Sequence, residues 1–575
     1  MVSGLIIAWP LFGQILSQNP KDLKVAYPNS QAQTTSDRIF VIGHVAGSGE
    51  LRLNGQLVRR SKTGNFAPSV PLALGKNRLA LRYQASGKGL STNLEVERLP
   101  AYPVPPSSLG AIMTYPASSI SMPPGERICF AAIATPQTQV QVIVGNLQIP
   151  LQAHPNYREL PPNSAILTGN NQPVPTAGNY LGCGTFSDPI ADQPVIYQVS
   201  RHGNKISQTA PGKITIAPPS TIAVVTLEQA IARSGPGSDY ARLTPLPQHT
   251  QALVTATAGE WLRLDYGGWV ERQAVKLSQG NMVPQSLVRS LSTRTKPGWT
   301  ELIIPLQVPV PISISQSDRY FDLTLYNVTA QTDTILANSD PILSRLEWQQ
   351  LSPGQVRYRL SLKTKQPWGY QARYQGTNLV IALRHPPQNL NSATILLDPG
   401  HGSNADLGAR GGTGYPEKDV TLKLAKLLAP ELQKQGMKVI FTRTGDQDIL
   451  PGDRAQQIEQ LQPTLALSLH YNALPDQGDA ENTAGIGVFW YHSQSHSLAQ
   501  YLHDYLTTKL QRPSYGVFWN NLALTRPTVA PAVLLELGFM THPQEFEWIV
   551  DPIAQTQLAK TLAAAVGEWL KLALD

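Results

Sequence analysis

Two patterns of hydrophobic and polar positions divide the chain. Up to about residue 390, apolar residues alternate with polar ones over short runs that are separated by Gly, Pro and Asn, as in half-buried β-strands. From Ala393 the apolar runs become continuous, as in ATILLDPG, LALSLH and AVLLELGF, and amphipathic helical stripes separate them. Strands that alternate with helices indicate a layered α/β fold with helices on both faces of the sheet. The expected fold class is therefore multidomain, with several all-β modules followed by an α/β C-terminal domain.

Individual elements follow from the same patterns. The step Asn54–Gln56 predicts a hairpin, because an Asn-Gly pair accepts the positive φ angles of a tight turn. The Pro-rich stretch after residue 100 is typical of a stiff linker, and Pro155–Gly178 is expected to form loops. The expected strands of the first 218 residues are Arg38–Val45, Glu50–Leu53, Val58–Arg60, Val70–Leu74, Asn77–Tyr83, Cys129–Ile133, Val140–Leu147 and Val195–Arg201. The expected helices of the C-terminal domain are Val420–Gln435, Leu498–Leu510 and Ile553–Leu574.

Composition narrows the class of protein. Of the 575 residues, 41% are hydrophobic and 15% are charged, which argues against a disordered chain and against a coiled coil. The length predicts about three to five domains. We expect an export signal or leader at 1–23, β modules at 24–100, 101–218, 219–279 and 284–388, and the α/β domain at 391–575.

The net charge of +7 is unevenly distributed, since residues 1–391 carry a net charge of +13 and residues 392–575 a net charge of −6. The basic part suits an anionic surface, and the acidic part is expected to be a separate unit. Basic residues do not occur in runs interleaved with aromatic ones, so nucleic acid is not an expected partner. Residues 351–391 contain six basic side chains and no acidic one, which fits either a solvated face or contact with an anionic polymer.

The cysteines and the apolar segments give information on where in or outside the cell the protein is located. Cys129 and Cys183 are the only cysteines, so a Cys-rich metal cluster is excluded, and either a disulfide or two free thiols fits the sequence. The apolar segment Leu5–Leu16 resembles the core of a signal peptide, although a basic stretch before it and a small-residue cleavage site after it are missing; a buried segment is the alternative. An apolar run of 18 residues does not occur, so no membrane-spanning helix is expected.

Four polar residues of the C-terminal domain stand where its apolar pattern least explains them. His401 follows the strand ATILLDPG, and Glu417 begins the first helix. His470 ends the strand LALSLH, and Glu536 lies within AVLLELGF. Two imidazoles and a carboxylate can form a three-point zinc site with one open position. A further carboxylate beside such a site can act as general base and then as general acid.

Each of these residues also has a structural interpretation. His401 can be a turn histidine, and Glu417 can stabilise its helix through the helix dipole. His470 can be a hydrogen-bonded core histidine, and Glu536 can pair with a basic side chain. All four lie at strand ends or element starts, where active sites of α/β sheets gather, so the pattern favours a metallohydrolase. The HExxH motif of the zincins is absent.

The same segments resemble a known family. The motifs LLDPGHGSNADLGARGGTGYPEKDVTLKLAKLL, VIFTRTGDQDILPGDRAQQI, LALSLHYNA and PAVLLELGFMTHPQE occur in this order in residues 393–573. They are similar to those of the zinc-dependent N-acetylmuramoyl-L-alanine amidases, the amidase-3 family. The resemblance implies a twisted mixed sheet flanked by helices. It implies that His401, Glu417 and His470 bind one Zn²⁺ ion and that Glu536 is the catalytic acid/base.

The implied reaction is hydrolysis of the amide bond between N-acetylmuramic acid and L-alanine in peptidoglycan, for cell-wall remodelling or daughter-cell separation. Asn472 should share the face of His470 on an extended strand, where it either hydrogen-bonds substrate or forms a turn at the strand end. The chain departs from the family pattern at Ser403 and at His542. About a dozen residues separate Asn472 from the strand GIGVFWY, too few for the inhibitory helix found in some members. We therefore expect an open groove, or control by the N-terminal modules.

The preceding modules also resemble wall-associated ones. Residues 24–100 are similar to a bacterial immunoglobulin-like module, and ARSGPG, LTPLP, GEWLRL and GGWV in residues 219–279 are similar to a bacterial SH3 (SH3b) domain. Residues 284–388 resemble an AMIN domain. The expected protein is thus a secreted hydrolase, periplasmic or cell-wall associated, with peptidoglycan as its partner and an unknown activator. The alternatives are a zinc peptidase acting within the stem peptide and a catalytically dead peptidoglycan-binding scaffold.

Overall fold

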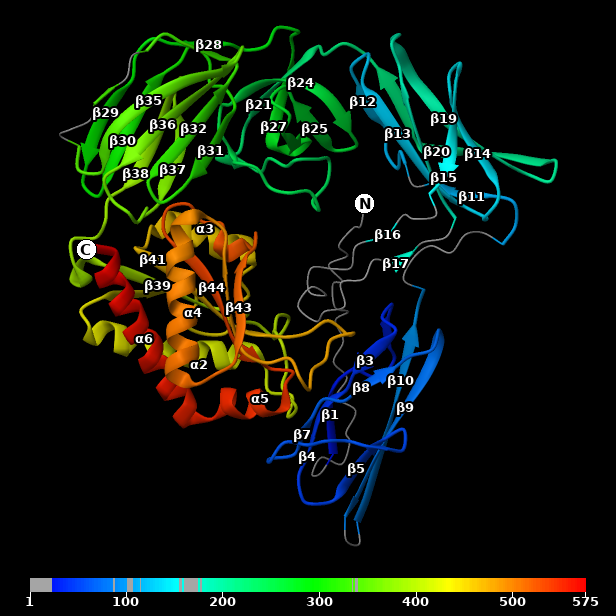
Figure 1. The fold of residues 1–575 in the computed structure, drawn as a ribbon, viewed down its shortest axis with the longest axis vertical. Coiled ribbons are helices and arrows are strands. Elements are labelled where there is room, and N and C mark those ends of the chain that lie inside the picture. The colour runs from blue at the N-terminus through cyan, green and yellow to red at the C-terminus, as the bar shows by residue number, and fades with distance from the viewer. Residues whose placement is uncertain are drawn as a thin grey trace.

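The computed structural model describes residues 23–85, 88–100, 107–113, 115–154, 158–159, 174–175, 178–332, 335–336 and 340–574. The export signal expected at 1–23 and most of the loop expected at Pro155–Gly178 lie outside these residues. The architecture is mostly β, with an α/β domain at the C-terminus (Figure 1). Within the described part of the chain, none of the helices is both long and apolar enough to cross a membrane.

The N-terminal module has a core of its own, which includes Ile39, Phe66 and Val96. Its sheets have the strand orders β1-β4-β7, β2-β10-β9-β5-β6 and β3-β8. The expected hairpin is confirmed, since Asn54 and Gly55 have φ angles of 48° and 85° between two paired strands. The strands are β1 (Leu23–Tyr27), β2 (Ala32–Thr34), β3 (Arg38–Phe40), β4 (Ile42–Val45), β5 (Glu50–Leu53), β6 (Gln56–Leu57), β7 (Asn65–Phe66), β8 (Ser69–Pro71), β9 (Gly75–Ala85) and β10 (Lys88–Arg98).

One continuous sheet joins the next two segments. Strand β12 pairs with β20 on one side and with β24 on the other, so the sheet crosses the boundary expected at residue 218. The hydrophobic cores on the two sides are nevertheless separate. The strands are β11 (Ala111–Met113), β12 (Ile120–Met122), β13 (Arg127–Ala134), β14 (Gln139–Val144), β15 (Leu147–Ala153), β16 (Arg158–Glu159), β17 (Val174–Pro175), β18 (Asn179–Thr185), β19 (Ile190–Arg201), β20 (Asn204–Ile216), β21 (Thr221–Val225), β22 (Gln229–Ala230), β23 (Leu246–Pro247), β24 (Gln251–Ala258), β25 (Trp261–Leu264), β26 (Trp269–Glu271) and β27 (Val275–Gln279).

Residues 286–384 form a further β module whose core includes Leu302, Phe321 and Ile381. Its main sheets have the strand orders β29-β30-β38-β37 and β31-β32-β36-β35-β34. The strands are β28 (Ser286–Val288), β29 (Ser292–Lys296), β30 (Trp299–Pro305), β31 (Ile312–Gln316), β32 (Tyr320–Tyr326), β33 (Val328–Ala330), β34 (Ile335–Leu336), β35 (Leu343–Ser352), β36 (Gln355–Leu362), β37 (Tyr370–Gln375) and β38 (Asn378–Arg384).

The C-terminal domain is built on a six-stranded mixed sheet of order β40-β39-β41-β44-β42-β43. All neighbouring strands are parallel except β42 and β44. Helices α2, α4 and α6 bury their apolar stripes in a large core on one face, and α3 contributes Ile458 to a smaller core on the other. The strands are β39 (Thr394–Pro399), β40 (Lys438–Phe441), β41 (Leu465–Asn472), β42 (Ile486–Trp490), β43 (Ser514–Trp519) and β44 (Ala532–Phe539). The helices are α2 (Glu417–Lys434), α3 (Pro451–Leu461), α4 (His496–Leu510), α5 (Pro543–Val550) and α6 (Pro552–Leu574).

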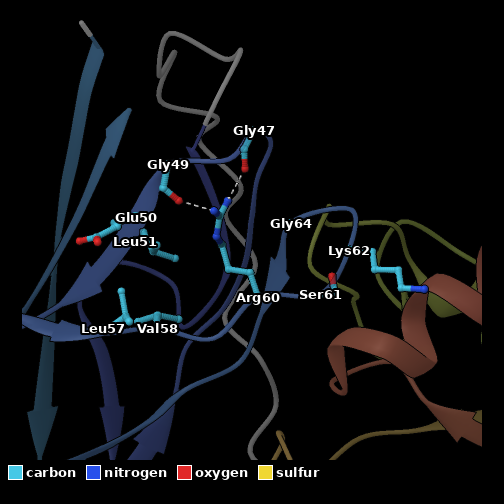
Figure 2. Close-up of a pocket in the computed structure, with 10 residues that line it drawn as sticks. All are labelled: Gly47, Gly49, Glu50, Leu51, Leu57, Val58, Arg60, Ser61, Lys62 and Gly64. Carbon is cyan, nitrogen blue, oxygen red and sulfur yellow. Dashed lines mark hydrogen bonds between the residues drawn. The ribbon is translucent and has the colours of Figure 1, made fainter. Parts of the chain in front are cut away.

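The module at 286–384 and the N-terminal module both pack against this domain. Arg384 of β38 donates hydrogen bonds to the backbone oxygens of Gln462, Pro463 and Val529. The N-terminal module reaches α5 through its loop 61–64, which Figure 2 shows beside a pocket of about 290 Å³ in the same module. Two hydrogen bonds from Thr63 to Glu547 make this contact, at 2.6 and 2.9 Å. The C-terminal domain is therefore held between modules that are distant in sequence.

Some expected elements were wrong in detail. Val58–Arg60 is not a strand, because the chain turns at Asn54–Gly55 and pairs at β6 instead. Val140–Leu147 is not one strand either, because Gly145, with a φ of 58°, ends β14 and the chain returns as β15. The expected helix at Val420–Gln435 begins three residues earlier, at Glu417. Helices α3 and α5 were not expected.

Candidate metal centre

His401 lies just beyond the carboxyl end of β39, in a backbone conformation that is uncommon for a residue with a side chain. Its φ angle is 60°, in the left-handed region that costs about 1–3 kcal/mol outside glycine. Two buried arginines hold the carbonyl groups on either side. Arg443 donates to the oxygens of Pro399 and Gly400 at 2.8 and 2.9 Å, and Arg454 donates to the oxygens of Pro399 and His401. Side chains of neighbouring elements thus hold the backbone of this turn in place.

The charge of Arg454 is balanced by Asp398, the residue before Pro399. Asp398 is fully buried and accepts hydrogen bonds from Arg454 at 2.8 Å, Thr442 at 2.5 Å and Ser468 at 2.6 Å. Burial alone would raise the pKa of this carboxyl, but Arg454 and the two hydroxyl donors lower it below its usual value. Such a fully paired buried carboxylate fixes the strand end that leads to His401.

Glu417 is the first residue of α2 and is almost completely buried. Its Oε2 accepts a hydrogen bond from the amide of Ala409 at 2.8 Å, and its Oε1 accepts one from the amide of Tyr471 at 3.0 Å. A carboxylate near a helix N-terminus is also favoured by the helix dipole. The carboxylate therefore has one orientation, with both oxygens held beside the end of β41.

His470 lies near the carboxyl end of β41, next to His401. A Cβ atom at Gly400 would come within 2.3 Å of the His470 ring, so a side chain at that position would displace the imidazole. Gly408, with a φ of 67°, has a similar role, since a Cβ there would lie 2.5 Å from Glu417 Oε2. Two glycines therefore leave room for the three polar side chains.

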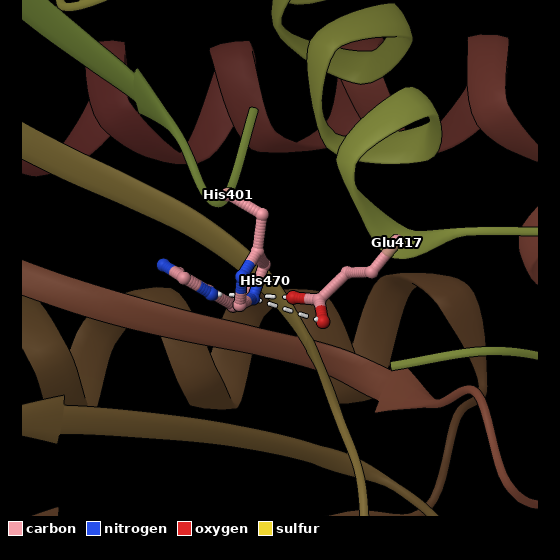
Figure 3. Close-up of side chains that lie close together, drawn as sticks. All are labelled: His401, Glu417 and His470. Carbon is pink, nitrogen blue, oxygen red and sulfur yellow. Dashed lines mark hydrogen bonds and ion pairs between the residues drawn. The ribbon is translucent and has the colours of Figure 1, made fainter. Parts of the chain in front are cut away.

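The structure brings His401, Glu417 and His470 together, as Figure 3 shows. One ligand atom from each lies within 4.8 Å of the others. His401 Nε2 is 3.1 Å from Glu417 Oε2, and His470 Nδ1 is 3.2 Å from Glu417 Oε1. The group could therefore hold one metal ion. Two imidazoles and one carboxylate are a donor set that suits Zn²⁺ and leaves a position open.

A second carboxylate orients His401. Asp406 accepts a hydrogen bond from His401 Nδ1 at 2.6 Å, so the other ring nitrogen, Nε2, faces Glu417. This arrangement is usual around metal-binding histidines, because it fixes the tautomer and the ring. Burial alone would lower the pKa of His401, but Asp406 and Glu417 raise it to about 10. A metal ion that binds here therefore displaces a proton.

Glu536 of β44 lies beside this group. The register pairs Glu536 with His470 across the neighbouring strands. Its Oε2 is buried without a hydrogen-bond partner among the described residues. Burial raises the pKa of Glu536 well above its usual value, and the negative charge of Glu417 raises it further. A buried carboxyl oxygen without a partner in the protein calls for an explanation. A group that binds in the site could be that partner, as expected for an acid/base residue beside the metal group.

Asn472 and His542 are not part of this group, and their side chains bind neighbouring backbone amides. Asn472 ends β41, and its side-chain oxygen accepts a hydrogen bond from the next amide, that of Ala473, at 2.8 Å. His542 caps helix α5, because its Nδ1 accepts a hydrogen bond from the amide of Glu545 at 3.1 Å. Residues 473–485 contain turns and no helix, in agreement with the expected lack of an inserted inhibitory helix.

Sequence reasoning missed Asp406, Gly408 and the buried pair of Asp398 and Arg454. Asp406 and Gly408 lie in a polar loop without periodicity, so only their proximity to His401 in the chain could have indicated them. Asp398 and Arg454 belong to the motifs LLDPGHG and PGDRAQQ. A charged residue at the end of an otherwise apolar strand was the available signal for Asp398.

Comparison with known proteins finds one family that the C-terminal domain resembles. Residues 395–568 match the family model of the N-acetylmuramoyl-L-alanine amidases. The probable cell wall amidase LytH of Staphylococcus aureus is 35% identical over 200 residues, which are 34% of this chain and 64% of that protein. The chain thus spans slightly less than two thirds of the length of this curated relative.

Solved structures of similar proteins also correspond to this domain. The N-acetylmuramoyl-L-alanine amidase from Clostridium difficile 630 is 32% identical, and the match covers 31% of this chain and 97% of that one with a TM-score of 0.30. The amidase AmiC2 of Nostoc punctiforme is 27% identical, with 31% and 97% of the chains covered and a TM-score of 0.29. The family match begins at residue 395, so the preceding modules take no assignment from it.

Proposed function

We propose that the protein hydrolyses the amide bond between N-acetylmuramic acid and L-alanine in peptidoglycan, because residues 395–568 match the family model of the N-acetylmuramoyl-L-alanine amidases. One observation carries this proposal: His401, Glu417 and His470 meet in one group beside Glu536, whose Oε2 is buried without a hydrogen-bond partner among the described residues. A dead scaffold would be expected to lack at least one of these four residues, and all four are present.

In this proposal the three clustered residues hold one Zn²⁺ ion. A zinc ion bound in such a site lowers the pKa of a water and polarises a carbonyl group. Asp406 accepts a hydrogen bond from His401 Nδ1, which keeps Nε2 available as a ligand. Glu536 takes a proton from the attacking water at its carboxylate and returns it to the leaving amine of L-alanine. Asn472 stands at the strand end where its side chain can contact the substrate.

We further propose that the modules before residue 391 hold the chain on peptidoglycan. The immunoglobulin-like, SH3b and AMIN resemblances support this, as does the net charge of +13 in residues 1–391. Cys129 and Cys183 face each other on β13 and β18 and form a disulfide, a bond typical of proteins outside the cytoplasm. Together with the relatives named as cell wall amidases, this supports an exported protein that works in the periplasm or the wall. Tethering raises the local concentration of substrate around the C-terminal domain.

The test combines product analysis with one substitution. Full-length protein loaded with zinc is incubated with purified sacculi, and the products are separated and identified. The proposal predicts free L-alanine amines and intact glycan strands. Glu536→Gln should lower the rate by about 10²–10⁴-fold with the zinc content unchanged, whereas the control Asp448→Asn, an exposed carboxylate of the same domain, should keep the full rate.

The alternatives give different products. New amines within the stem peptide would assign a zinc peptidase instead. Binding to sacculi without any product from the zinc-loaded protein would assign a scaffold. An unchanged rate in Glu536→Gln would remove Glu536 from the mechanism.

A further inference from the structure

Arg233 and Arg242, in the β module at 219–279, lie side by side with little opposite charge to balance them. Arg233 and Arg242 are directly opposite each other in an antiparallel bridge, and the flanking hydrogen bonds from Ser234 to Ala241 and from Leu243 to Ala232 mark a pair whose side chains are close. Like charges in such a pair are destabilising. Their retention calls for an explanation.

A third arginine, from the C-terminal domain, joins them. Arg526 precedes β44, and its guanidinium donates only to the side chain and backbone oxygens of Asn521. Burial, together with the nearby charges of Arg242 and Arg233, lowers the pKa of Arg526 to about 10. We call Arg233, Arg242 and Arg526 the arginine seam, because they meet where the two domains adjoin.

The seam lacks paired carboxylates within the described part of the chain. Glu271 and Asp239 lie in electrostatic range of Arg233, yet none of the described ion pairs includes a seam arginine. Arg233 is 8% exposed; its Nη1 donates to the backbone oxygen of Tyr240 at 2.8 Å, whereas its Nε is buried without a hydrogen-bond partner among the described residues. A buried guanidinium nitrogen without a partner indicates a group that the protein does not provide.

An aromatic surface adjoins the seam. The hydroxyl of Tyr491 donates to the backbone oxygen of Arg242 at 3.5 Å, and the Tyr491 ring stacks on Trp519 with ring centroids 5.7 Å apart and planes 13° from parallel. Trp519 is 68% exposed, which is unusual for the largest apolar side chain. A flat exposed aromatic face beside guanidinium groups suits a ligand that has both an apolar ring face and oxyanions.

This surface is separate from the metal centre. Strand β42 runs antiparallel to β44, with Gly487 opposite Glu536 and Phe489 opposite Leu534. Each residue along β42 therefore leads away from Glu536 by about 3.3 Å. Tyr491 follows the end of β42 and Trp519 ends β43, so both lie at the strand ends opposite to Glu536, on the side where Arg242 of the β module at 219–279 contacts Tyr491.

We propose that the arginine seam and the Tyr491–Trp519 stack form a second binding site for an oxyanion-bearing sugar polymer of the cell wall. The identity of the polymer as a wall glycan rests on the proposed function, whereas the site itself rests on the seam. Guanidinium groups bind carboxylates and phosphates alike, so the anion can be a stem-peptide carboxylate or a phosphodiester of an accessory wall polymer. The sugar ring stacks on Trp519, and the site holds the chain on the wall independently of the metal centre.

The test measures binding of the full-length protein to purified sacculi by co-sedimentation. Arg242→Ala combined with Arg526→Ala should weaken binding about tenfold, and Trp519→Ala should weaken it about fivefold without any change in charge. The control is Arg127→Ala combined with Arg289→Ala, which removes the same charge from two exposed positions elsewhere and should leave binding within twofold. Because Trp519 is exposed, Trp519→Ala keeps the test decisive even if the double arginine variant fails to fold.

A second arm identifies the anion. Sacculi treated with hydrofluoric acid lose phosphodiester-linked polymers, so a loss of seam-dependent binding there assigns the phosphodiester, and its retention assigns the carboxylate. Wild-type binding by both the double variant and Trp519→Ala would overturn the proposal. Failure of the amidase proposal would show differently, as missing L-alanine amines with seam-dependent binding still present.

Discussion

At the scale of single residues, the candidate centre depends on how firmly His401 is oriented. Its left-handed backbone is unfavourable for a non-glycine residue, so the conformation persists only because its surroundings fix it. Arg454 and Arg443 bind the neighbouring carbonyls, and Asp406 binds the ring. Of these residues, only Asp406 contacts the imidazole itself. It binds Nδ1, the ring nitrogen opposite the expected ligand atom Nε2.

Asp406→Ala should therefore weaken metal binding without unfolding the domain. The Asp406 side chain is partly exposed, so the fold should tolerate its removal. The His401 imidazole, however, loses the acceptor that sets its tautomer. Loss of such an outer partner costs about 10–100-fold in metal affinity, measured by competition of the purified protein with a zinc chelator. Asp448→Ala is the matched control, and equal affinities of the two variants would show that Asp406 does not position His401.

At the scale of elements, the sequence predicted those parts of the C-terminal domain that have a strong hydrophobic period. The strands β39, β41 and β44 are buried on both faces and read as continuous apolar runs. Helix α3 was missed because it is largely polar, with Arg454 and Ile458 as its buried residues. Helix α5 was missed because its eight residues are too few to show a period.

The same reasoning explains what could be foreseen of the site. His401, Glu417, His470 and Glu536 stand out because polar residues at the ends of apolar strands are rare. Asp406 could not be foreseen, since it lies in a loop without a hydrophobic period. The pairing of Arg233 with Arg242 depends on a bridge between two irregular segments, and neither segment shows a strand pattern.

Helix α3 carries a buried carboxyl whose ionisation should affect stability. Burial raises the pKa of Glu459 to about 7, although hydrogen bonds from Thr528 oppose the shift. The folded protein therefore keeps this proton up to about pH 7, whereas the unfolded chain releases it near its ordinary value. The folded state binds more protons between these pH values, so the free energy of unfolding should fall as the pH rises from about 4.5 to about 7.

Glu459→Gln removes this titration. The decrease in the free energy of unfolding should therefore be about 2–3 kcal/mol smaller in the variant. The measurement is the difference in unfolding free energy between pH 5 and pH 8 for the wild type and the variant. Asp448→Asn, at an exposed position of the same domain, should leave the difference as in the wild type. A pH dependence that is identical in Glu459→Gln and the wild type would exclude this carboxyl as its source.

At the scale of the whole molecule, the N-terminal module touches the loops that carry the metal-centre residues. Tyr27 donates a hydrogen bond to Asp476 in the loop after His470, and Lys24 donates one to the backbone oxygen of Thr413 in the loop before Glu417. Ala480 of the first loop is fully buried in an apolar cluster with Phe40, Ile42 and Ala67 of the module. Residues at opposite ends of the chain thus restrain the same rim of the site.

Loosening this contact should make the loop after His470 more mobile while the metal centre stays intact. Tyr27→Phe combined with Thr63→Ala removes the side-chain hydrogen bonds from Tyr27 to Asp476 and from the Thr63 hydroxyl to Glu547, each worth about 1 kcal/mol. Amide hydrogen exchange at 474–481 should become about 5–30-fold faster in the full chain, and exchange in α4 should not change. Zinc affinity should remain within twofold, because the ligands are held by contacts inside the domain.

The matched control for that variant is Tyr320→Phe combined with Thr293→Ala, the same two chemical changes at exposed positions of the module at 286–384. This control should leave exchange at 474–481 as in the wild type. If the Tyr27 and Thr63 variant also exchanged at the wild-type rate there, the module would not restrain the loop in solution. If exchange rose throughout the C-terminal domain, the contact would stabilise the whole fold rather than one rim of the site, since local opening and global unfolding differ in how many amides they expose.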